Sequence, residues 1–398
     1  MRSRPPRTPA KKKRSRVIAI VLLIVVIILA GGTIAIWYFS NQQSEDSPLG
    51  KTEFDEPPYS ILTGLEIADA SLNNSPVYCI QIPNGSTDGA RPQAGLTDAA
   101  IVFEAIAEQG ITRFAAIFQN PTVSVIGPIR SLRPYYLDWD TPFDCTVTHA
   151  GGSAEALAAI ASGGQRNLDE NDDYMWRESG SSRLWNNLFT SPTLLNDFNN
   201  TNGYTSSNPI AFPRQTPDDN ARYLATKSNC ISQIAANEST DDACATFATL
   251  DTANSIDLKF TNYSYSHNVS YTYDPETNTY LRYHQDGQPH LSYACPADLH
   301  QPLTTAECGD PLQISPSVVI ALHVRESTMS DNYHEQITTI GSGTADIFQN
   351  GEHLSANWRK TAQSSQIIFT DDNGNEISLV PGQLWISAIP QFGQIYYE

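Results

Sequence analysis

Outside its first 16 residues the sequence has very few lysines. The 398-residue chain carries 24 Lys or Arg and 43 Asp or Glu. Eight of the basic residues fall within residues 1–16, which leaves 16 basic residues, only four of them lysines, against all 43 acidic ones. Nucleic-acid binding needs a basic surface, so we expect no nucleic-acid partner. A chain of this length has room for two domains that each bury a core.

Charge is missing altogether from residues 17–39, an apolar run of 23 residues. A helix needs about 20 apolar residues to cross the hydrocarbon of a membrane, and a basic flank such as residues 1–16 stays in the cytoplasm. We therefore expect a single-pass cell-membrane protein with a transmembrane helix at 17–39, a polar tether at 40–60 and an extracytoplasmic bulk. The alternative is a cleaved signal peptide, whose apolar run is usually about 7–15 residues. The first cysteine is Cys79, so we expect no lipid anchor on a processed N-terminal cysteine.

C-x-x-C motifs are absent, although the chain has six cysteines. Cys230 and Cys244 enclose a short polar loop, as do Cys295 and Cys308, which is typical of disulfides outside the cytosol. Cys79 and Cys145 would form the third pair if their strands are neighbours, although the sequence allows other pairings. A zinc site is the alternative, with ligands from His284, His290, Cys295, His300 and Cys308. These histidine spacings fit no common zinc template, so we expect disulfides, no metal and no cofactor.

The pattern of elements changes along the chain. In residues 61–200, strand candidates at 76–82, 99–108, 112–119 and 144–150 alternate with helix candidates at 153–162 and 192–200. Residues 201–254 are a polar connector with a helix at 217–235 and the Cys230–Cys244 loop. Residues 255–398 contain strands joined by turn signals such as Asp-Pro and Asn-Gly. The sequence predicts an α+β ectodomain, with an α/β-type first domain on a mixed sheet and an all-β second domain.

Several long motifs resemble a known family. They are "ARPQAGLTDAAIVFEAIAEQGITRFAAIFQ", "IGPIRSLRPYYLDW" and "HAGGS" in the first part, and "YTYDPETNTYLRY", "SVVIALHV" and "GSGTADIFQNGEHLSANWRK" in the second. In this order they resemble the bacterial YerB family of envelope proteins, described by the domain of unknown function DUF3048. The resemblance implies a two-domain cell-envelope protein and no particular reaction. Family members are commonly lipoproteins, and they share a "PHN" segment where this chain has "WNNLF", which puts Asn186 in place of the expected histidine.

The predicted hairpin around Gly110 places charged residues on strands. With Gln109–Gly110 as a two-residue turn, Glu104, Glu108 and Arg113 share one face of the hairpin, and a one-residue change of register would break this relation. Glu104 lies within the apolar run "AAIVFEAIA", and a buried carboxylate needs a partner. Either this is a structural ion pair, or the carboxylates serve acid–base chemistry or ligand binding.

Arginine is concentrated in the same part of the chain. Arg91, Arg113, Arg130 and Arg133 fall within 43 residues. A pair of guanidinium groups suits a carboxylate or phosphate, and Tyr135 could stack on a guanidinium or a sugar ring. We expect these side chains to bind a polar, anionic ligand or to pair with carboxylates of the fold.

The segment "THAGGSAEAL" follows a strand and opens a helix. Gly151, Gly152 and Ser153 could present backbone N–H groups to an anion, or Ser153 could simply cap the helix. His149 ends the strand beside the glycines, where sites often lie in α/β sheets. It is a candidate for catalysis and equally for a structural role.

Three functions remain open from the sequence. The first is a membrane-anchored protein that binds an anionic cell-envelope component, such as a wall polymer or an envelope protein, through the arginines. The second is a cell-envelope hydrolase or transferase that uses Glu104 or Glu108 with His149. The third is a purely structural interaction protein.

Overall fold

The computed structural model describes residues 57–178, 183, 185–236, 242–261, 267–296, 305–331 and 333–398. The predicted cytoplasmic tail, the predicted transmembrane helix and residues 40–56 of the predicted tether lie outside these ranges. Within them, no helix is both long and apolar enough to cross a membrane. Residues Pro57–Glu398 form one compact unit.

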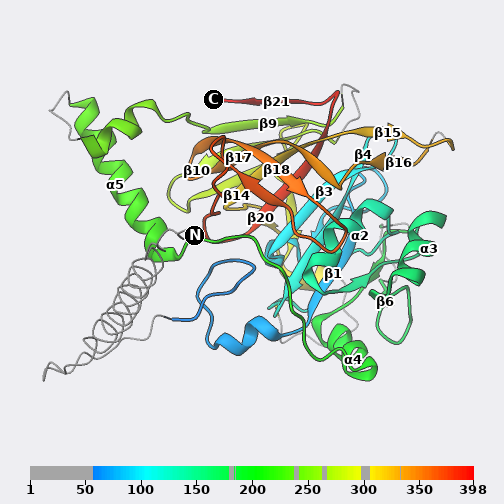
Figure 1. The fold of residues 1–398 in the computed structure, drawn as a ribbon. Coiled ribbons are helices and arrows are strands. Elements are labelled where there is room, and N and C mark those ends of the chain that lie inside the picture. The colour runs from blue at the N-terminus through cyan, green and yellow to red at the C-terminus, as the bar shows by residue number, and fades with distance from the viewer. Residues whose placement is uncertain are drawn as a thin grey trace, which may run out of the picture. The chain divides into compact units, whose positions relative to one another are not determined.

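A ten-stranded mixed sheet runs through both predicted regions (Figure 1). Its strands, in spatial order, are β19 (Ile368–Thr370), β18 (Glu352–Lys360), β17 (Gly341–Gln349), β14 (Val318–Val324), β20 (Leu384–Pro390), β3 (Ile101–Glu108), β4 (Ile111–Gln119), β1 (Val77–Pro83), β5 (Thr146–Thr148) and β6 (Arg166–Leu168). The two regions meet where β20 pairs in parallel with β3, from Leu384 opposite Ile101 to Ser387 opposite Glu104. Because this pairing is continuous, the two regions are packed as one unit.

Smaller sheets surround this framework. A four-stranded sheet has the order β11 (Thr279–His284), β10 (Val269–Asp274), β9 (Ser255–Lys259) and β21 (Gln394–Tyr397). It shares a buried core with the ten-stranded sheet, in which Leu258 and Tyr271 belong to the same cluster as Val319 and Phe348. The short sheets are β13 (Leu312–Gln313), β12 (Leu291–Tyr293) and β2 (Gln93–Ala94), then β15 (Glu326–Thr328) with β16 (Glu335–Ile337), and β7 (Trp176–Arg177) with β8 (Leu188–Phe189). The structure thus has the expected mixed α/β part and an all-β part.

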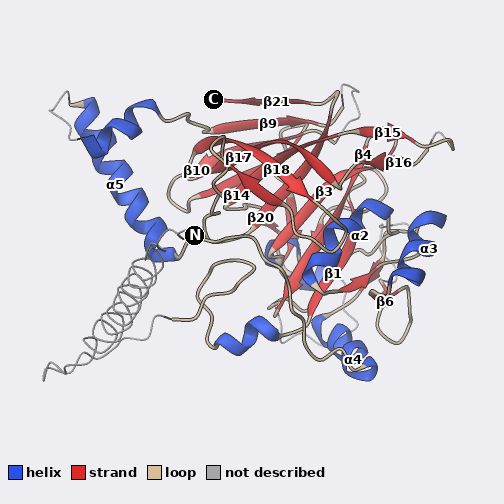
Figure 2. Cartoon of the chain, in the orientation of Figure 1, coloured by secondary structure: helices blue, strands red, loops and turns tan. Residues whose placement is uncertain are grey.

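Three of the four α-helices in the described residues begin at a capping side chain. The four helices are α2 (Pro134–Asp140), α3 (Ala154–Gly163), α4 (Pro192–Asn202) and α5 (Pro217–Ala235). Ser153, Ser191 and Thr216 each accept a hydrogen bond from a backbone N–H of the first turn. Figure 2 shows α2, α3 and α4 around the β1–β6 end of the large sheet, with α5 standing away from it. Short 3-10 helices lie at Ala70–Asn74, Leu96–Asp98, Thr141–Phe143, Asp242–Thr249 and Thr305–Cys308.

All three expected disulfides are present. Cys230 is bonded to Cys244, Cys295 to Cys308, and Cys79 to Cys145. The last pair forms because β1 and β5 are parallel neighbours, with Cys79 opposite Val147. Three bonds of this kind indicate a protein that folds in an oxidising compartment.

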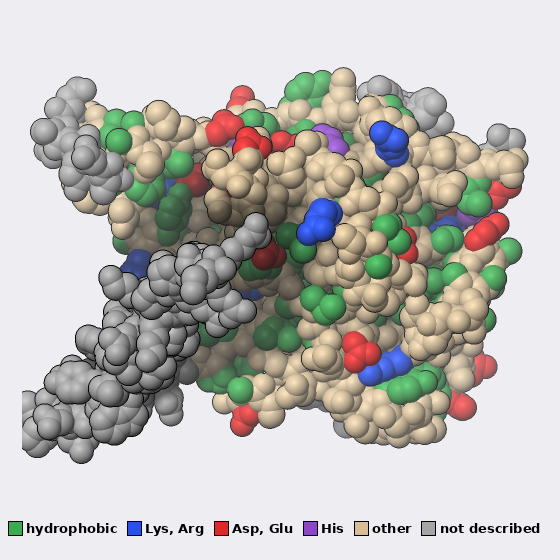
Figure 3. Space-filling model, viewed as in Figure 1, with side chains coloured by type: hydrophobic (Ala, Val, Ile, Leu, Met, Phe, Trp, Pro, Cys, Tyr) green, Lys and Arg blue, Asp and Glu red, His purple; other side chains and the backbone are tan. Residues whose placement is uncertain are grey.

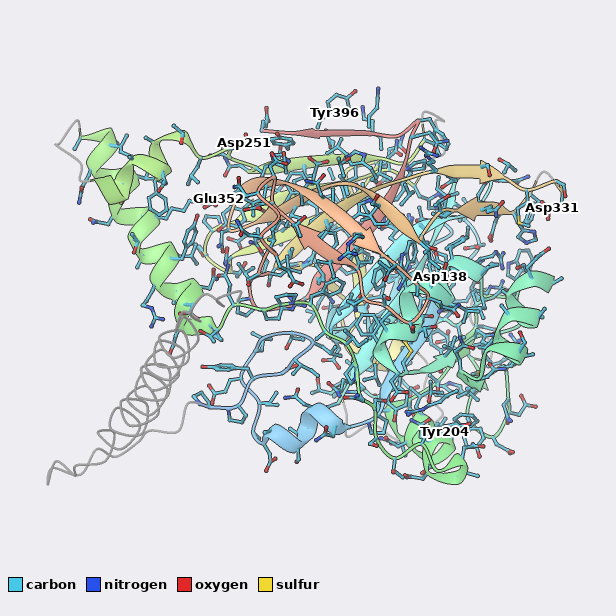
Figure 4. All side chains as sticks on the ribbon, in the orientation of Figure 1. Asp138, Tyr204, Asp251, Asp331, Glu352 and Tyr396 are labelled. Carbon is cyan, nitrogen blue, oxygen red and sulfur yellow. A yellow bond between two sulfur atoms is a disulfide. The ribbon has the colours of Figure 1, made fainter. Side chains whose placement is uncertain are left out.

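The connector is anchored to the β17–β18 hairpin by polar contacts (Figure 4, where Asp251 and Glu352 are labelled). Lys227 of α5 pairs with Glu352 at 2.6 Å, and the Tyr223 hydroxyl donates to the same carboxylate. Further along the connector, Asp251 accepts from His353 Nδ1, whose other ring nitrogen contacts Asp346. These two carboxylates raise the pKa of His353 against the effect of its burial.

Candidate functional site

A bulge in the β3–β4 hairpin separates the two glutamates that were expected together. Glu108 lies opposite Ile111 as predicted, but Ile106 is opposite Thr112 and Glu104 is opposite Phe114. The extra residue on β3 changes the register by one, and a change of one residue moves a side chain to the other face. The prediction that Glu104 shares a face with Arg113 is therefore wrong, whereas Glu108 and Arg113 do meet.

Glu108 joins two arginines at the edge of a pocket of about 550 Å³. One carboxylate oxygen accepts from Arg113 Nη2 at 2.7 Å and the other accepts from Arg133 Nη2 at 2.8 Å. Arg113 also donates to the carbonyl of Ser131, and Arg133 donates to the carbonyl of Leu132. These contacts fix both guanidinium groups, so the chain presents them in one arrangement.

Arg130 lies in the same pocket and is held differently. Its Nε donates to Asn186 Oδ1 at 2.6 Å, and the Asn186 amide in turn donates to the carbonyl of Asp88. Within the ranges that the structure describes, its two terminal nitrogens make no hydrogen bond or ion pair. Burial, followed by the neighbouring Arg113, lowers the pKa of Arg130, yet it remains a cation at neutral pH.

The rest of the lining is mostly polar and includes the rings of Trp185, Tyr333 and His267. The full set is Pro83, Asn84, Gly85, Ser86, Thr87, Asp88, Glu108, Ile111, Thr112, Arg113, Arg130, Ser131, Arg133, Trp185, His267 and Tyr333. Three arginines thus face two carboxylates, Glu108 and Asp88, which gives the pocket an excess of positive charge. The predicted residues Glu108, Arg113, Arg130 and Arg133 are brought together here.

The other lining residues were not predicted from the sequence, among them Trp185, Tyr333 and His267. Trp185 and Tyr333 are 61% and 45% exposed, and both come from segments without a periodic pattern. His267 is 5% exposed, and its ring nitrogens make no hydrogen bond of normal geometry to any described residue, although the backbone of Gly110 and Asn84 lies near. Burial, with a smaller contribution from Arg91, lowers the pKa of His267 to about 4, so the ring is neutral. The departure of "WNNLF" from the family pattern was the one sequence signal near these residues.

Glu104 belongs to the protein interior. It is fully buried and pairs with the equally buried Arg282 of β11, at 2.8 Å. It also accepts from Thr112, from Trp385 Nε1 and from Ser387. The Arg282 guanidinium lies 4.5 Å from the ring centre of Trp385. Each oxygen of Glu104 is thus held by donors of the fold itself.

The contacts of Glu104 continue into a closed chain of hydrogen bonds. Arg282 Nε donates to His290 Nδ1, His290 Nε2 contacts Gln93 Oε1, and the Gln93 amide donates to Asn84. The Asn84 amide donates to Thr112, which returns to Glu104. We call the set Glu104, Arg282, His290, Gln93, Asn84 and Thr112 the buried ring. Only Asn84 and Thr112 of this ring also line the pocket.

Arg91 sits between the ring and the loop at residues 84–88. Its Nε donates to Asn84 Oδ1 at 2.8 Å, and burial lowers its pKa to about 10. It is not part of the pocket lining. Arg91 therefore supports the position of Asn84 and does not extend the arginine cluster.

The remaining predicted residues serve the fold. His149 is buried, with Nδ1 bonded to the carbonyl of Gly151 and Nε2 to Asn167. Ser153 caps α3, while Gly152 forms a bridge with Leu132. Neither His149 nor residues 151–153 line the pocket, so the predicted ligand-binding residues do not all belong to one site with the arginines.

Tyr135 is also in the core. It is 3% exposed, and its hydroxyl donates to the carbonyl of Ile106. It lies in the first turn of α2, which begins at Pro134, and its ring packs inward against Tyr136 and Trp139, so it does not stack on a pocket guanidinium.

The zinc alternative does not fit the structure. Cys295 and Cys308 are bonded to each other, and His290 is held by Arg282 and Gln93. Among the described residues, no group of three or more His, Cys, Asp or Glu is arranged to hold a metal ion.

Comparisons with known proteins identify the family. The N-terminal domain of "Protein of unknown function (DUF3048)" matches residues 62–205, and its C-terminal domain matches residues 256–386. The chain is 26% identical over 335 residues to "Putative lipoprotein YerB" of Bacillus subtilis (strain 168), covering 83% of this chain and 85% of the relative. The crystal structure of YerB protein from Bacillus subtilis shows the same fold, with a TM-score of 0.65 and 22% identity over 85% of this chain and 99% of that chain. The chain belongs to the DUF3048 family and carries both of its domains.

Proposed function

We propose that this protein binds an anionic component of the cell envelope in the pocket formed by Glu108, Arg113, Arg130 and Arg133. The observation that carries the proposal is the state of Arg130. Its guanidinium is held at Nε by Asn186, while its terminal nitrogens are not used by any described residue. A guanidinium fixed in this way has donors ready for a carboxylate or phosphate oxygen.

The arrangement around Arg130 supports the same proposal. Glu108 occupies one nitrogen on each of Arg113 and Arg133, so the two side chains are oriented without the ligand. A binding site that is already ordered loses less entropy on binding. The positive excess in the pocket also contrasts with the strongly acidic chain, which makes the pocket a local attraction for an anion.

The envelope location rests on three observations. The three disulfides fit an oxidising compartment, a relative is named a putative lipoprotein, and residues 17–39 are long and apolar enough for a membrane span. We propose a single-pass anchor through residues 17–39 with the pocket outside the cytoplasm.

The geometry gives no comparable support to the hydrolase or transferase. Glu104 is paired with Arg282 inside the protein, His149 has both ring nitrogens bonded, and both oxygens of Glu108 are engaged by arginines. These three residues do not form an acid–base pair around one cavity.

The test compares Arg130→Ala with Arg222→Ala, which removes the same charge from an exposed position on α5. Binding of soluble cell-wall fragments to the purified full-length chain would be measured by calorimetry, and folding by thermal melting. We expect Arg130→Ala to weaken binding by about tenfold or more, the loss of a charge-assisted hydrogen bond, with little change in melting temperature. Equal binding by the wild type and both variants would overturn the proposal.

A further inference from the structure

The aromatic residues at the pocket point to the class of ligand. Trp185 is 61% exposed and Tyr333 is 45% exposed, and both line the cavity that contains the arginines. Single exposed aromatic residues are common on protein surfaces, but two that border one cavity are more telling, because ligand pockets are commonly lined by aromatic side chains. Flat rings of this kind offer an apolar face to a ligand that is otherwise polar.

The residue that follows Trp185 is held by hydrogen bonds. Asn186, the next residue, donates from its backbone to the carbonyl of Arg183 and from its side chain to the carbonyl of Asp88. Gly89 approaches Arg183 so closely that a Cβ there would lie 2.4 Å from the Arg183 Cα. Trp185 thus lines the same cavity as Arg130 and is the chain neighbour of Asn186, the residue that positions Arg130.

Hydroxyl groups make up much of the remaining lining. Ser86, Thr87 and Ser131 border the cavity, and a hydroxyl can both donate and accept. The carboxylates Asp88 and Glu108 add acceptors, and His267 adds a neutral ring. An alternation of an aromatic face with small donors and acceptors suits a ring that has apolar C–H faces and hydroxyl edges, which is a sugar.

The charge of the whole chain limits how acidic the ligand can be. Beyond residue 16 the chain has 16 basic and 43 acidic residues. On the face shown in Figure 3, the Lys and Arg side chains are few and scattered among acidic ones. Such a protein repels a densely charged polymer at long range, while the three arginines attract a single acidic group at short range.

Together these features go one step beyond anion binding. We propose that the pocket takes a sugar ring bearing a single carboxylate or phosphate, within a glycan whose acidic groups are widely spaced, with Trp185 as the stacking platform and Arg130 as the contact to the acid. This rests on the proposed function above. The volume of about 550 Å³ falls in the range of about 300–1,000 Å³ that is typical of small-molecule sites, which is larger than a lone phosphate needs.

The experiment uses the purified full-length chain and four probes measured by calorimetry. They are a disaccharide of glucuronic acid and N-acetylglucosamine, the same disaccharide with its carboxyl group converted to a neutral amide, poly(glycerol phosphate), and phosphatidylglycerol vesicles. The variants are Trp185→Ala, Trp185→Phe and Arg130→Ala, with Phe392→Ala as the control, because Phe392 is 46% exposed and lies outside the lining.

We expect Trp185→Ala to weaken binding of the acidic disaccharide about tenfold. Trp185→Phe should recover most of this loss, and Phe392→Ala should bind as the wild type does. Arg130→Ala should weaken binding of the acidic disaccharide and leave that of the neutral amide unchanged.

The failures are distinguishable. If Trp185→Ala binds the acidic disaccharide as tightly as the wild type while Arg130→Ala does not, the proposed stacking of a sugar on Trp185 is wrong. The proposed binding of an anion by Arg130 is then kept. Tighter binding of poly(glycerol phosphate) or of vesicles than of the disaccharide would contradict the proposal that the ligand is a glycan with widely spaced acidic groups. If Arg130→Ala matches the wild type on every probe, the proposed function itself fails.

Discussion

The buried ring and the pocket both contain arginine paired with glutamate. They differ in whether the positive charges and the arginine N–H donors are all matched by acceptors of the protein. In the ring, one arginine meets one carboxylate, both are fully buried, and Thr112, Trp385 and Ser387 donate further hydrogen bonds to Glu104. In the pocket, Glu108 is shared by two arginines and Arg130 has terminal nitrogens that no described residue uses. A balanced set of charges stabilises the fold, whereas an excess of cations facing a cavity can also bind a ligand.

Breaking the ring should cause the largest effect. Glu104→Gln leaves Arg282 buried without its counter-charge, and removing one partner of a buried pair costs about 3–5 kcal/mol. Urea unfolding of the disulfide-intact protein would measure this as a lower midpoint. The double variant Glu104→Gln with Arg282→Met removes both charges and should be less destabilised than Glu104→Gln alone. A single variant as stable as the wild type would show that the ring is not a structural pair.

Removing Glu108 should separate stability from binding. Glu108→Gln weakens the contacts of Arg113 and Arg133, and we expect the free energy of unfolding to fall by about 2–3 kcal/mol. The pocket then gains positive charge, so affinity for an acidic probe should rise a few-fold, opposite to the effect of Arg130→Ala. Calorimetry and urea unfolding on the same preparation would test both parts. Weaker binding together with lower stability would mean that Glu108 is needed to orient the arginines.

Asn186 should affect binding more than folding. Asn186→Ala removes the acceptor for Arg130 Nε, so the guanidinium loses its orientation. We expect affinity for an acidic probe to fall about three- to tenfold and stability to fall by about 1–2 kcal/mol. Asn187→Ala is the neighbouring control, since the Asn187 side chain contacts Arg177 and Glu178 and does not line the pocket. Similar losses of affinity in Asn186→Ala and Asn187→Ala would show that binding depends on the local backbone around these residues and not on the contact between Asn186 and Arg130.

These contrasts also show what the sequence could reveal. The helices at 153–162, 192–200 and 217–235, the two short-loop disulfides (Cys230–Cys244 and Cys295–Cys308) and the strands up to residue 150 follow from local patterns, which the structure matches within a few residues. The convergence of Arg113, Arg130, Arg133 and Glu108 followed from the hairpin and from arginine density. The role of Glu104 did not, because a single bulged residue on β3 moves every earlier side chain to the other face.

Contacts between residues far apart in the chain could not be predicted from the sequence either. Arg282 lies 178 positions from Glu104, in a region expected to be a separate domain, and no local pattern links the two. Trp185, His267 and Tyr333 come from three distant segments, and only the fold brings them to one pocket. Local sequence patterns do not reveal which residues make tertiary contacts of this kind, because the fold alone brings them together.

The smallest predicted effect concerns the histidines, which again differ between the ring and the pocket. His290 is bonded at both ring nitrogens, whereas His267 is buried in the pocket without a hydrogen bond of normal geometry among the described residues. Burial lowers the pKa of His267 from 6.5 to about 4. Between these two values the unfolded chain binds a proton that the folded chain does not, so the stability contributed by neutral His267 is lost as the pH falls through this window.

His267→Gln has no such group and should not lose this contribution. The stability of the wild type relative to His267→Gln should therefore decline between about pH 6.5 and pH 4, as measured by urea midpoints at several pH values, with the disulfides intact. Binding of an acidic probe at pH 7 and pH 5.5 should differ little between the two proteins, because His267 is neutral at both values. If the wild type instead gains affinity at pH 5.5 and His267→Gln does not, His267 becomes protonated in the pocket, and it would then belong with the arginines as a fourth cation.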